Sequence, residues 1–155
     1  MDTTRIAGAF VTEAGTGEIQ AGEVLPDLDV PITTTLIVSG AIASRDFYPG
    51  HHDAAIARER GSADVFLNVM TTSGIVGRYL TDWAGPRAVM RSLAIKLGAP
   101  GYPGDVLSLH GEVTDSSPDP QGRLLTIQVT GKNRLGAHVR ATAKLLLPGA
   151  ETKGD

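Results

Sequence analysis

One long helical pattern followed only by strand patterns constrains the fold of this chain more than any other feature. Residues that would share one helix face recur within residues 68–83: Val69, Thr72, Val76 and Leu80. Gly85-Pro86 then ends the helix. Beyond it, the apolar residues alternate as in antiparallel strands, with no helical pattern between them. Because parallel βαβ units need such helices, the order predicts an α+β fold with an antiparallel sheet around one central helix.

Four strands are predicted after the helix, at residues 88–97, 106–115, 123–133 and 137–147. Tyr102-Pro103-Gly104-Asp105 predicts a tight turn between the first two, because Pro-Gly is a strong turn signal. Residues 116–122 are expected to form a polar loop, and residues 134–136 a hairpin connection. The sequence also contains two glycines in the predicted helix, Gly74 and Gly77, which weaken it. They would allow close packing of the sheet or leave room for a ligand.

The first half of the chain divides into an arm and the start of the domain. Residues 1–22 are small and polar and predict a flexible N-terminal arm, in which residues 9–12 are one candidate for a short strand. The domain is predicted to span residues 23–148, and residues 149–155 form a C-terminal tail. Pro26 and Pro31 favour an extended stretch, because each disfavours helix in the residue before it.

Residues 31–43 are open to two interpretations. Their β-branched side chains favour a strand, whereas Pro31 followed by threonines favours a capped helix. We prefer the helix, with Leu36, Ala41 and Ile42 on its inner face. Residues 44–53 form a loop around a Pro-Gly turn, and residues 54–60 form a short helix that ends at Gly61.

Composition excludes several classes of function. The chain has 14 Lys and Arg against 17 Asp and Glu, so no basic field would attract nucleic acid. It has no cysteine, which excludes disulfides and thiolate chemistry. No apolar run reaches the roughly 18–20 residues of a membrane span. The N-terminus does not resemble a signal peptide, so a cytoplasmic protein without membrane contact is expected.

The loop at residues 44–53 contains a cluster of acidic and histidine side chains. Asp46, His51, His52 and Asp53 cluster around Pro49-Gly50, and a turn could bring an Asp and a His to one water molecule. The carboxylate could then accept a proton while the imidazole, which titrates near neutral pH, transfers another.

Two other interpretations of this loop stay open. It could be a solvated loop in which Asp53 simply caps the following helix. It could also bind a metal, although His51-His52-Asp53 lacks the i, i+4 spacing that places ligands on one helix face. The remaining histidines, His110 and His138, fall in strand patterns and are predicted to have no chemical role.

Three segments resemble motifs of the MaoC-like enoyl-CoA hydratases, which have the hot-dog fold. Residues 44–53 resemble the pattern S-x-D-x-N-P-x-H-x-D, with matches at Asp46, Pro49, His51 and Asp53. Residues 100–107 resemble P-x-Y-P-G-D-x-L, and residues 133–139 resemble N-x-x-G-x-x-V. The resemblance covers residues 23–148. The combined pattern, including residues 81–86, looks most like an actinobacterial subgroup acting on steroid side-chain enoyl-CoA esters.

The resemblance implies an (R)-specific hydratase that adds water across the double bond of a 2-enoyl-CoA thioester. Asp46 would act as the base, and His51 would hold the water and carry a proton. The start of the central helix would receive the thioester oxygen, so the implied substrate-binding residues are Tyr48, Asn68, Val69, Met70 and Gly74. CoA would enter as part of the substrate, with no bound cofactor and no metal.

The chain departs from the family pattern at two places. Tyr48 stands where the family usually has Asn, and Asn68-Val69 stands where it usually has His-Gly. The resemblance also implies pairing, as a homodimer or with a related hot-dog chain. Two alternatives follow: a non-catalytic subunit that supports an active partner, or a thioesterase. A thioesterase would use a carboxylate on the central helix, where Asp82 is the only acid and lies near the wrong end.

Overall fold

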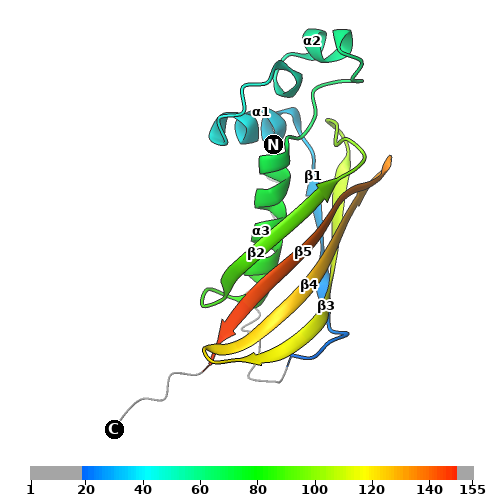
Figure 1. Cartoon of the computed structure of the whole chain (residues 1–155). Helices are drawn as coiled ribbons and strands as arrows, with labels where there is room; N and C mark the ends of the chain where they lie inside the picture. The colour runs from blue at the N-terminus through cyan, green and yellow to red at the C-terminus, as the bar shows by residue number, and fades with distance from the viewer. Residues whose placement is uncertain (1–18, 150–155) are drawn as a thin grey trace, which may run out of the picture.

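A computed structural model describes residues 19–149 and contains one antiparallel sheet curled around one long helix (Figure 1). The strands follow the spatial order β1-β3-β4-β5-β2. Their bounds are β1 Val24–Pro31, β2 Val89–Leu97, β3 Val106–Asp119, β4 Gly122–Asn133 and β5 Gly136–Pro148. The helices are α1 Thr34–Ala43, η1 Pro49–His51 (a 3-10 turn), α2 Ala54–Glu59 and α3 Val69–Ala84. The predicted α+β architecture is confirmed.

The central helix and the strands lie close to where the sequence predicts them. Helix α3 begins one residue later than predicted because Asn68 is its N-cap, and it ends at Gly85, whose φ of 85° suits glycine. The predicted loop at residues 116–122 is wrong. Strand β3 continues to Asp119, which pairs with Gly122 at the start of β4, so only two residues connect the strands. The polar residues of this segment suggested a loop. However, the apolar residues further along β3 and β4 set the register of the two strands, and the same pairing continues through the polar residues.

The core lies between the sheet and one face of α3. That face buries Val76, Tyr79, Leu80 and Trp83 against the inward residues of the strands. Tyr79 packs over Gly111 of β3, where a Cβ would come within 3.0 Å of the tyrosine ring. Burial raises the pKa of Tyr79 to about 12, so its hydroxyl stays protonated at neutral pH.

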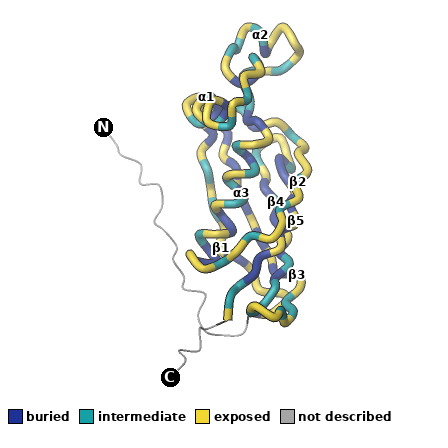
Figure 2. The backbone as a smooth tube through the Cα atoms, turned by 60° about the vertical axis from the view of Figure 1, so that its left-hand side comes forward, coloured by how far each residue is buried: buried dark blue, intermediate teal, exposed yellow. Residues whose placement is uncertain are grey.

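Helices α1 and α2 lie beyond one end of α3 rather than on the sheet (Figure 2). Thr33 caps α1 by accepting a hydrogen bond from the Leu36 N–H, so the capped-helix interpretation is confirmed. The predicted inner face is confirmed at Ala41, which is buried, and at Leu36, which packs half-buried against the core. It is wrong at Ile42, which is 60% exposed, because Ile37 takes the inner position instead. A Cβ at Gly40 would lie only 2.2 Å from the Thr71 hydroxyl, so this glycine lets α1 cross close to α3.

The last residues of the predicted arm contact the domain. Ile19 is buried, its carbonyl accepts from the Ser116 hydroxyl, and the Gly22 N–H donates to Val113. Residues 19–22 therefore belong with the folded domain. The short strand considered at residues 9–12, and most of the C-terminal tail, lie outside the described residues. No helix within residues 19–149 is long and apolar enough to span a membrane.

Candidate active site

Asp46 is positioned by the C-terminal end of α1. The N–H of Arg45 donates to Ile42 and the N–H of Asp46 donates to Ala41, at 3.0 and 2.9 Å. This pattern is a Schellman motif, which requires a left-handed residue directly after the C-cap. Glycine usually takes that position, but here Arg45 adopts a φ of 57°. The chain thus accepts local strain immediately before Asp46.

His51 is held by its backbone and by two aromatic rings. It ends the 3-10 turn η1 and is 6% exposed. Its Nδ1 lies 2.7 Å from the carbonyl oxygen of Phe66. Since a carbonyl only accepts, Nδ1 must carry a proton, which leaves Nε2 as the nitrogen that gains or loses one. The rings of Phe66 and Tyr48 pack edge-on against the imidazole, at 4.8 and 5.4 Å between centroids.

The two side chains predicted to act together do meet. Nε2 of His51 lies 3.3 Å from Oδ2 of Asp46. The side chain of Asp46 is 31% exposed and that of His51 only 7%, so the pair is reached from the carboxylate side. The amide of Asn68 donates to the same Oδ2 at 3.0 Å. This bond is the main reason that the pKa of Asp46 lies below its ordinary value, assisted by the Tyr48 N–H and by His51, while partial burial opposes it.

The start of α3 adjoins this pair. Asn68 is buried at 2% exposure and caps the helix by accepting from the Thr71 N–H at 2.8 Å. Its own carbonyl accepts from the Thr72 N–H. Val69 and Met70 are the first two residues of α3, so their N–H groups have no acceptor within the helix. Both side chains are about half exposed, at 44% and 56%. An accessible helix N-terminus with free N–H groups suits a developing negative charge.

The other two sequence motifs hold the backbone around the site. The carbonyl of Gly101 accepts from the Leu67 N–H at 3.0 Å, directly after Phe66, the partner of His51. The Tyr102 hydroxyl lies 3.2 Å from the Ser62 hydroxyl, and the Asn133 amide donates to the Pro100 carbonyl at 2.8 Å. These motifs therefore act structurally, by fixing the segment that orients His51.

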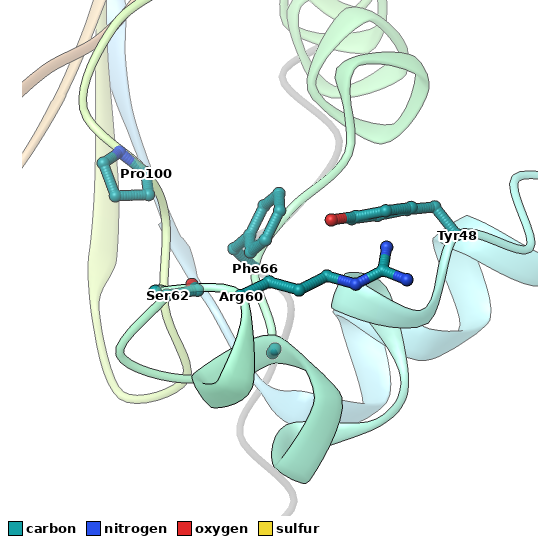
Figure 3. Close-up of a pocket in the computed structure, with 7 residues that line it drawn as sticks. Tyr48, Arg60, Ser62, Phe66 and Pro100 are labelled. Carbon is teal, nitrogen blue, oxygen red and sulfur yellow. The ribbon is translucent and has the colours of Figure 1, made fainter.

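A cavity of about 310 Å³ lies between the reactive loop, α2 and the Pro100 segment (Figure 3). Tyr48, Phe66 and Pro100 form its apolar walls, and Arg60 and Ser62 add polar groups. The Arg60 guanidinium lies 5.2 Å from the centre of the Tyr48 ring, a cation–π distance. Tyr48 and Phe66 also pack on His51, so the cavity and the imidazole share two walls.

A family model described as "MaoC like domain" matches residues 17–135, which is most of the chain. This chain is a member of the MaoC-like family. A relative named 3-oxo-4,17-pregnadiene-20-carboxyl-CoA hydratase beta subunit, from Mycobacterium tuberculosis, is 46% identical over 124 residues. Those residues are 80% of this chain and 93% of the relative.

Solved structures agree with this assignment. The ChsH1–ChsH2 complex from Mycobacterium tuberculosis contains a chain that is 45% identical, with a TM-score of 0.76, covering 82% of this chain and 97% of that one. The (R)-hydratase from A. caviae involved in PHA biosynthesis has a TM-score of 0.73 and 21% identity, covering 84% and 98%. The second match concerns the fold alone. The predicted hot-dog fold is confirmed.

The predicted substrate-binding residues of this MaoC-like chain do not all lie in one place. Tyr48 lines the cavity, whereas Asn68 is buried behind Asp46. Val69, Met70 and Gly74 are exposed on α3. A Cβ at Gly74 or at Gly77 would meet nothing within 4 Å, so the interpretation that these glycines allow close sheet packing is wrong.

The alternative chemistries fare differently. Asp53 accepts from the N–H groups of Ala55 and Ile56, so it does cap α2 as one interpretation held. Asp82, the acid a thioesterase would need, pairs with Arg78 at 3.1 Å. It lies fourteen positions after Asn68, which is roughly 21 Å along an α-helix. Within residues 19–149, no cluster of three His, Asp or Glu side chains could hold a metal ion.

Sequence reasoning missed two contributors to the site of this MaoC-like chain. Phe66 acts through its backbone carbonyl, for which a sequence carries no signal. Ser44 accepts from the Asn68 amide at 2.9 Å and donates to the Gly40 carbonyl at 2.8 Å. The serine in the resembled loop pattern was a signal for the second, because it stands two residues before Asp46.

Proposed function

We propose that this chain is an enoyl-CoA hydratase that adds water across the double bond of a 2-enoyl-CoA thioester. The observation that carries the proposal is the 3.3 Å approach of His51 Nε2 to a partly exposed Asp46 carboxylate. Membership of the MaoC-like family and the hydratase name of the 46% identical relative support it.

The chemistry requires two proton transfers and one new carbon–oxygen bond. The oxygen of water bonds to C3 of the enoyl group, the C2–C3 double bond becomes single, and a proton is added at C2. Asp46 accepts a proton from the attacking water, and His51 holds that water and supplies the proton at C2 from Nε2. The proton on Asp46 then passes to Nε2, 3.3 Å away, which restores both groups. Because the two groups lie within 3.3 Å of each other and act on one water, we treat them as one unit.

Negative charge develops on the thioester oxygen during this reaction. We assign its stabilisation to the N–H groups at the start of α3, with Val69 the first helical residue. Met70 is the next residue and its side chain is exposed beside this end. A backbone donor serves whatever side chain it carries, so Val69 in place of the family's usual Gly does not remove it.

The substrate is proposed to carry a bulky acyl group related to a steroid side chain. The name of the 46% identical relative supports this class, since it specifies a pregnadiene-carboxyl-CoA hydratase. The open surface of α3 at Gly74 and Gly77 offers room for such a group. CoA is part of the substrate, and no bound cofactor is needed because hydration transfers no electrons. We place the enzyme in the cytoplasm, since CoA thioesters are highly charged and do not cross membranes.

We also propose that a second hot-dog chain covers the exposed side of α3 and encloses the acyl group between the two chains. The relative is named a beta subunit, and the 45% identical structure is a complex. The partner is a second copy or a related chain. We propose no nucleic-acid partner, since the 14 Lys and Arg are outnumbered by 17 Asp and Glu.

The test is an absorbance assay that follows loss of the conjugated double bond in a panel of 2-enoyl-CoAs, from crotonyl-CoA to steroid side-chain esters. The chain is assayed alone and co-purified with a related hot-dog chain, with native mass measured for each. Hydration that disappears in Asp46→Asn supports the proposal. A complex that hydrates equally well with Asp46→Asn in this chain would show a non-catalytic subunit instead.

A further inference from the structure

Asn68 is the buried polar side chain that links the central helix to the reactive loop. Its exposure is 2%, and its amide oxygen and amide nitrogen bond to three partners in all. Oδ1 accepts from the Thr71 N–H at 2.8 Å. Nδ2 donates to Ser44 Oγ at 2.9 Å and to Asp46 Oδ2 at 3.0 Å. One residue therefore caps α3 and contacts the carboxylate predicted to act as base.

These bonds fix the direction of the amide. The cap requires an acceptor facing the Thr71 N–H, so the oxygen must point into the helix and the NH₂ group toward Asp46. Ser44 already donates its only hydroxyl proton to Gly40, at 2.8 Å, so it too accepts from Asn68. A flipped amide would place its oxygen against the carboxylate and lose the cap. The network therefore has one stable orientation.

As a consequence, the two carboxylate oxygens of Asp46 have different hydrogen-bond partners. Oδ2 receives Asn68 and faces His51, whereas Oδ1 has only a 3.4 Å contact from the Tyr48 N–H. Without the Asn68 bond, only His51 and the long Tyr48 contact would hold this carboxylate, whose side chain is 31% exposed, so it could rotate. A buried donor on the same oxygen that faces the imidazole removes this freedom.

We infer that Asn68 is the positioning residue of this site, which keeps Oδ2 of Asp46 facing His51 and Oδ1 free for water. The inference rests on the proposed hydratase function, because it gives the geometry a reaction to serve. Asn68 touches no reacting atom and acts only through Asp46.

The test uses two substitutions that both retain the cap. Asn68→Ser keeps a hydroxyl acceptor for the helix and loses both N–H donors. Asn68→Asp keeps an acceptor that suits the helix N-terminus better still, but places a second negative charge against Asp46. If Asn68 only capped the helix, both variants would keep wild-type melting temperature and wild-type activity.

The positioning role predicts a different result. In Asn68→Ser, kcat falls by about 10- to 100-fold, the usual value of a hydrogen bond to a charged group, with KM unchanged. The acid limb of the rate profile moves to higher pH, because Asp46 loses the donor that stabilises its charged form. Carbon-13 NMR of the Asp46 carboxyl should show the same shift without any substrate. Asn68→Asp should lose more activity and move the titration further.

Two outcomes separate this inference from the proposed function. A wild-type rate, acid limb and Asp46 titration in Asn68→Ser would overturn the positioning role while hydration itself stood. A wild-type chain, alone and with its partner, that hydrates no enoyl-CoA would overturn the function. A shifted Asp46 titration in the variants would then still support positioning by Asn68.

Discussion

Two buried histidines beside the first turns of α3 have nearly the same backbone anchor. His51 is 6% exposed and His138 is 1% exposed. In each, Nδ1 lies 2.7 Å from a backbone carbonyl, that of Phe66 for His51 and that of Ala99 for His138. Both rings are thus fixed in the same tautomer, and burial alone does not distinguish them.

The second nitrogen separates the two. Nε2 of His51 faces the Asp46 carboxylate, whose side chain is 31% exposed, while Nε2 of His138 lies 3.0 Å from the fully buried Thr72 hydroxyl. The Asp46 carboxylate can accept a proton and is reached by solvent, whereas the Thr72 hydroxyl is enclosed by protein and already bonded to His138. The partner of Nε2 and its access to solvent therefore decide whether a buried histidine can transfer protons.

Asn68 joins the two regions. Its side chain contacts Asp46, and its backbone carbonyl accepts from the Thr72 N–H at 3.2 Å. Because only His51 faces a solvent-accessible carboxylate, substitutions around His51 should alter kcat, and substitutions around His138 should alter the free energy of unfolding.

The largest expected effect is at the pair itself. Asp46→Asn or His51→Ala should lower kcat by about 10²–10⁴, the usual contribution of one acid/base group, with the fold retained. The double variant should lose far less than the two effects combined, because both groups act on one water. Steady-state kinetics with circular dichroism checks this, and wild-type turnover in both single variants would remove the pair from the mechanism.

The helix start should give the next largest effect. Val69→Pro removes one backbone N–H in a first turn, where proline is tolerated, and should lower kcat by about 10²–10³. Val69→Gly is the control: it keeps the N–H and should keep activity, at a cost near 1 kcal/mol in the free energy of unfolding. A folded Val69→Pro enzyme with normal turnover would place the oxyanion site elsewhere or on a partner.

On the open surface of α3, the effect should depend on substrate size. Gly74→Leu is expected to lower kcat/KM for bulky enoyl-CoAs by about 10- to 200-fold, the range that a few methylenes change in an apolar pocket. Crotonyl-CoA should be spared, and the helix should become slightly more stable because leucine favours helix over glycine. Gly77→Leu is a second variant of the same surface. Equal losses on short and bulky substrates would argue against an acyl site there.

On the His138 side, stability should change and chemistry should not. His138→Leu has a similar volume but leaves Thr72 and the Ala99 carbonyl without this partner. The free energy of unfolding should fall by about 1–3 kcal/mol, the cost of unsatisfied buried polar groups. Denaturant titration measures it, and kcat per folded molecule should stay at the wild-type value. A selective loss of kcat would show that His138 also serves the reaction.

The smallest effect should come from the turn before Asp46. Arg45→Gly removes the strain of an arginine with a positive φ, which stabilises the folded state. Glycine also gives the unfolded chain more backbone freedom, which opposes this gain, so the free energy of unfolding should rise by less than about 1 kcal/mol. Arg45→Ala keeps the strain and should not gain. Thermal melts of the two variants give the comparison, and equal stability would show that the positive φ costs little here.

The sequence alone was enough to predict the architecture and the location of the reactive loop. Period-two alternation after the central helix predicted the four later strands, because side-chain burial repeats along the chain in a local pattern. Asp46 and His51 lie five residues apart across one Pro-Gly turn, so local sequence could also suggest that they meet. It failed at residues 116–122, where pairing with β4 overrode local polarity.

Only the tertiary structure decided what surrounds the pair. The Asn68 amide and the Phe66 carbonyl reach the loop from 22 and 15 residues away, and the Asn68 bond requires α3 to lie against α1. That approach depends on Gly40, where a side chain would collide with Thr71. Burial patterns repeat locally and can be read along a chain. Hydrogen-bond partners depend on which distant segments the packed core brings together. They therefore follow from the tertiary structure and not from the local sequence.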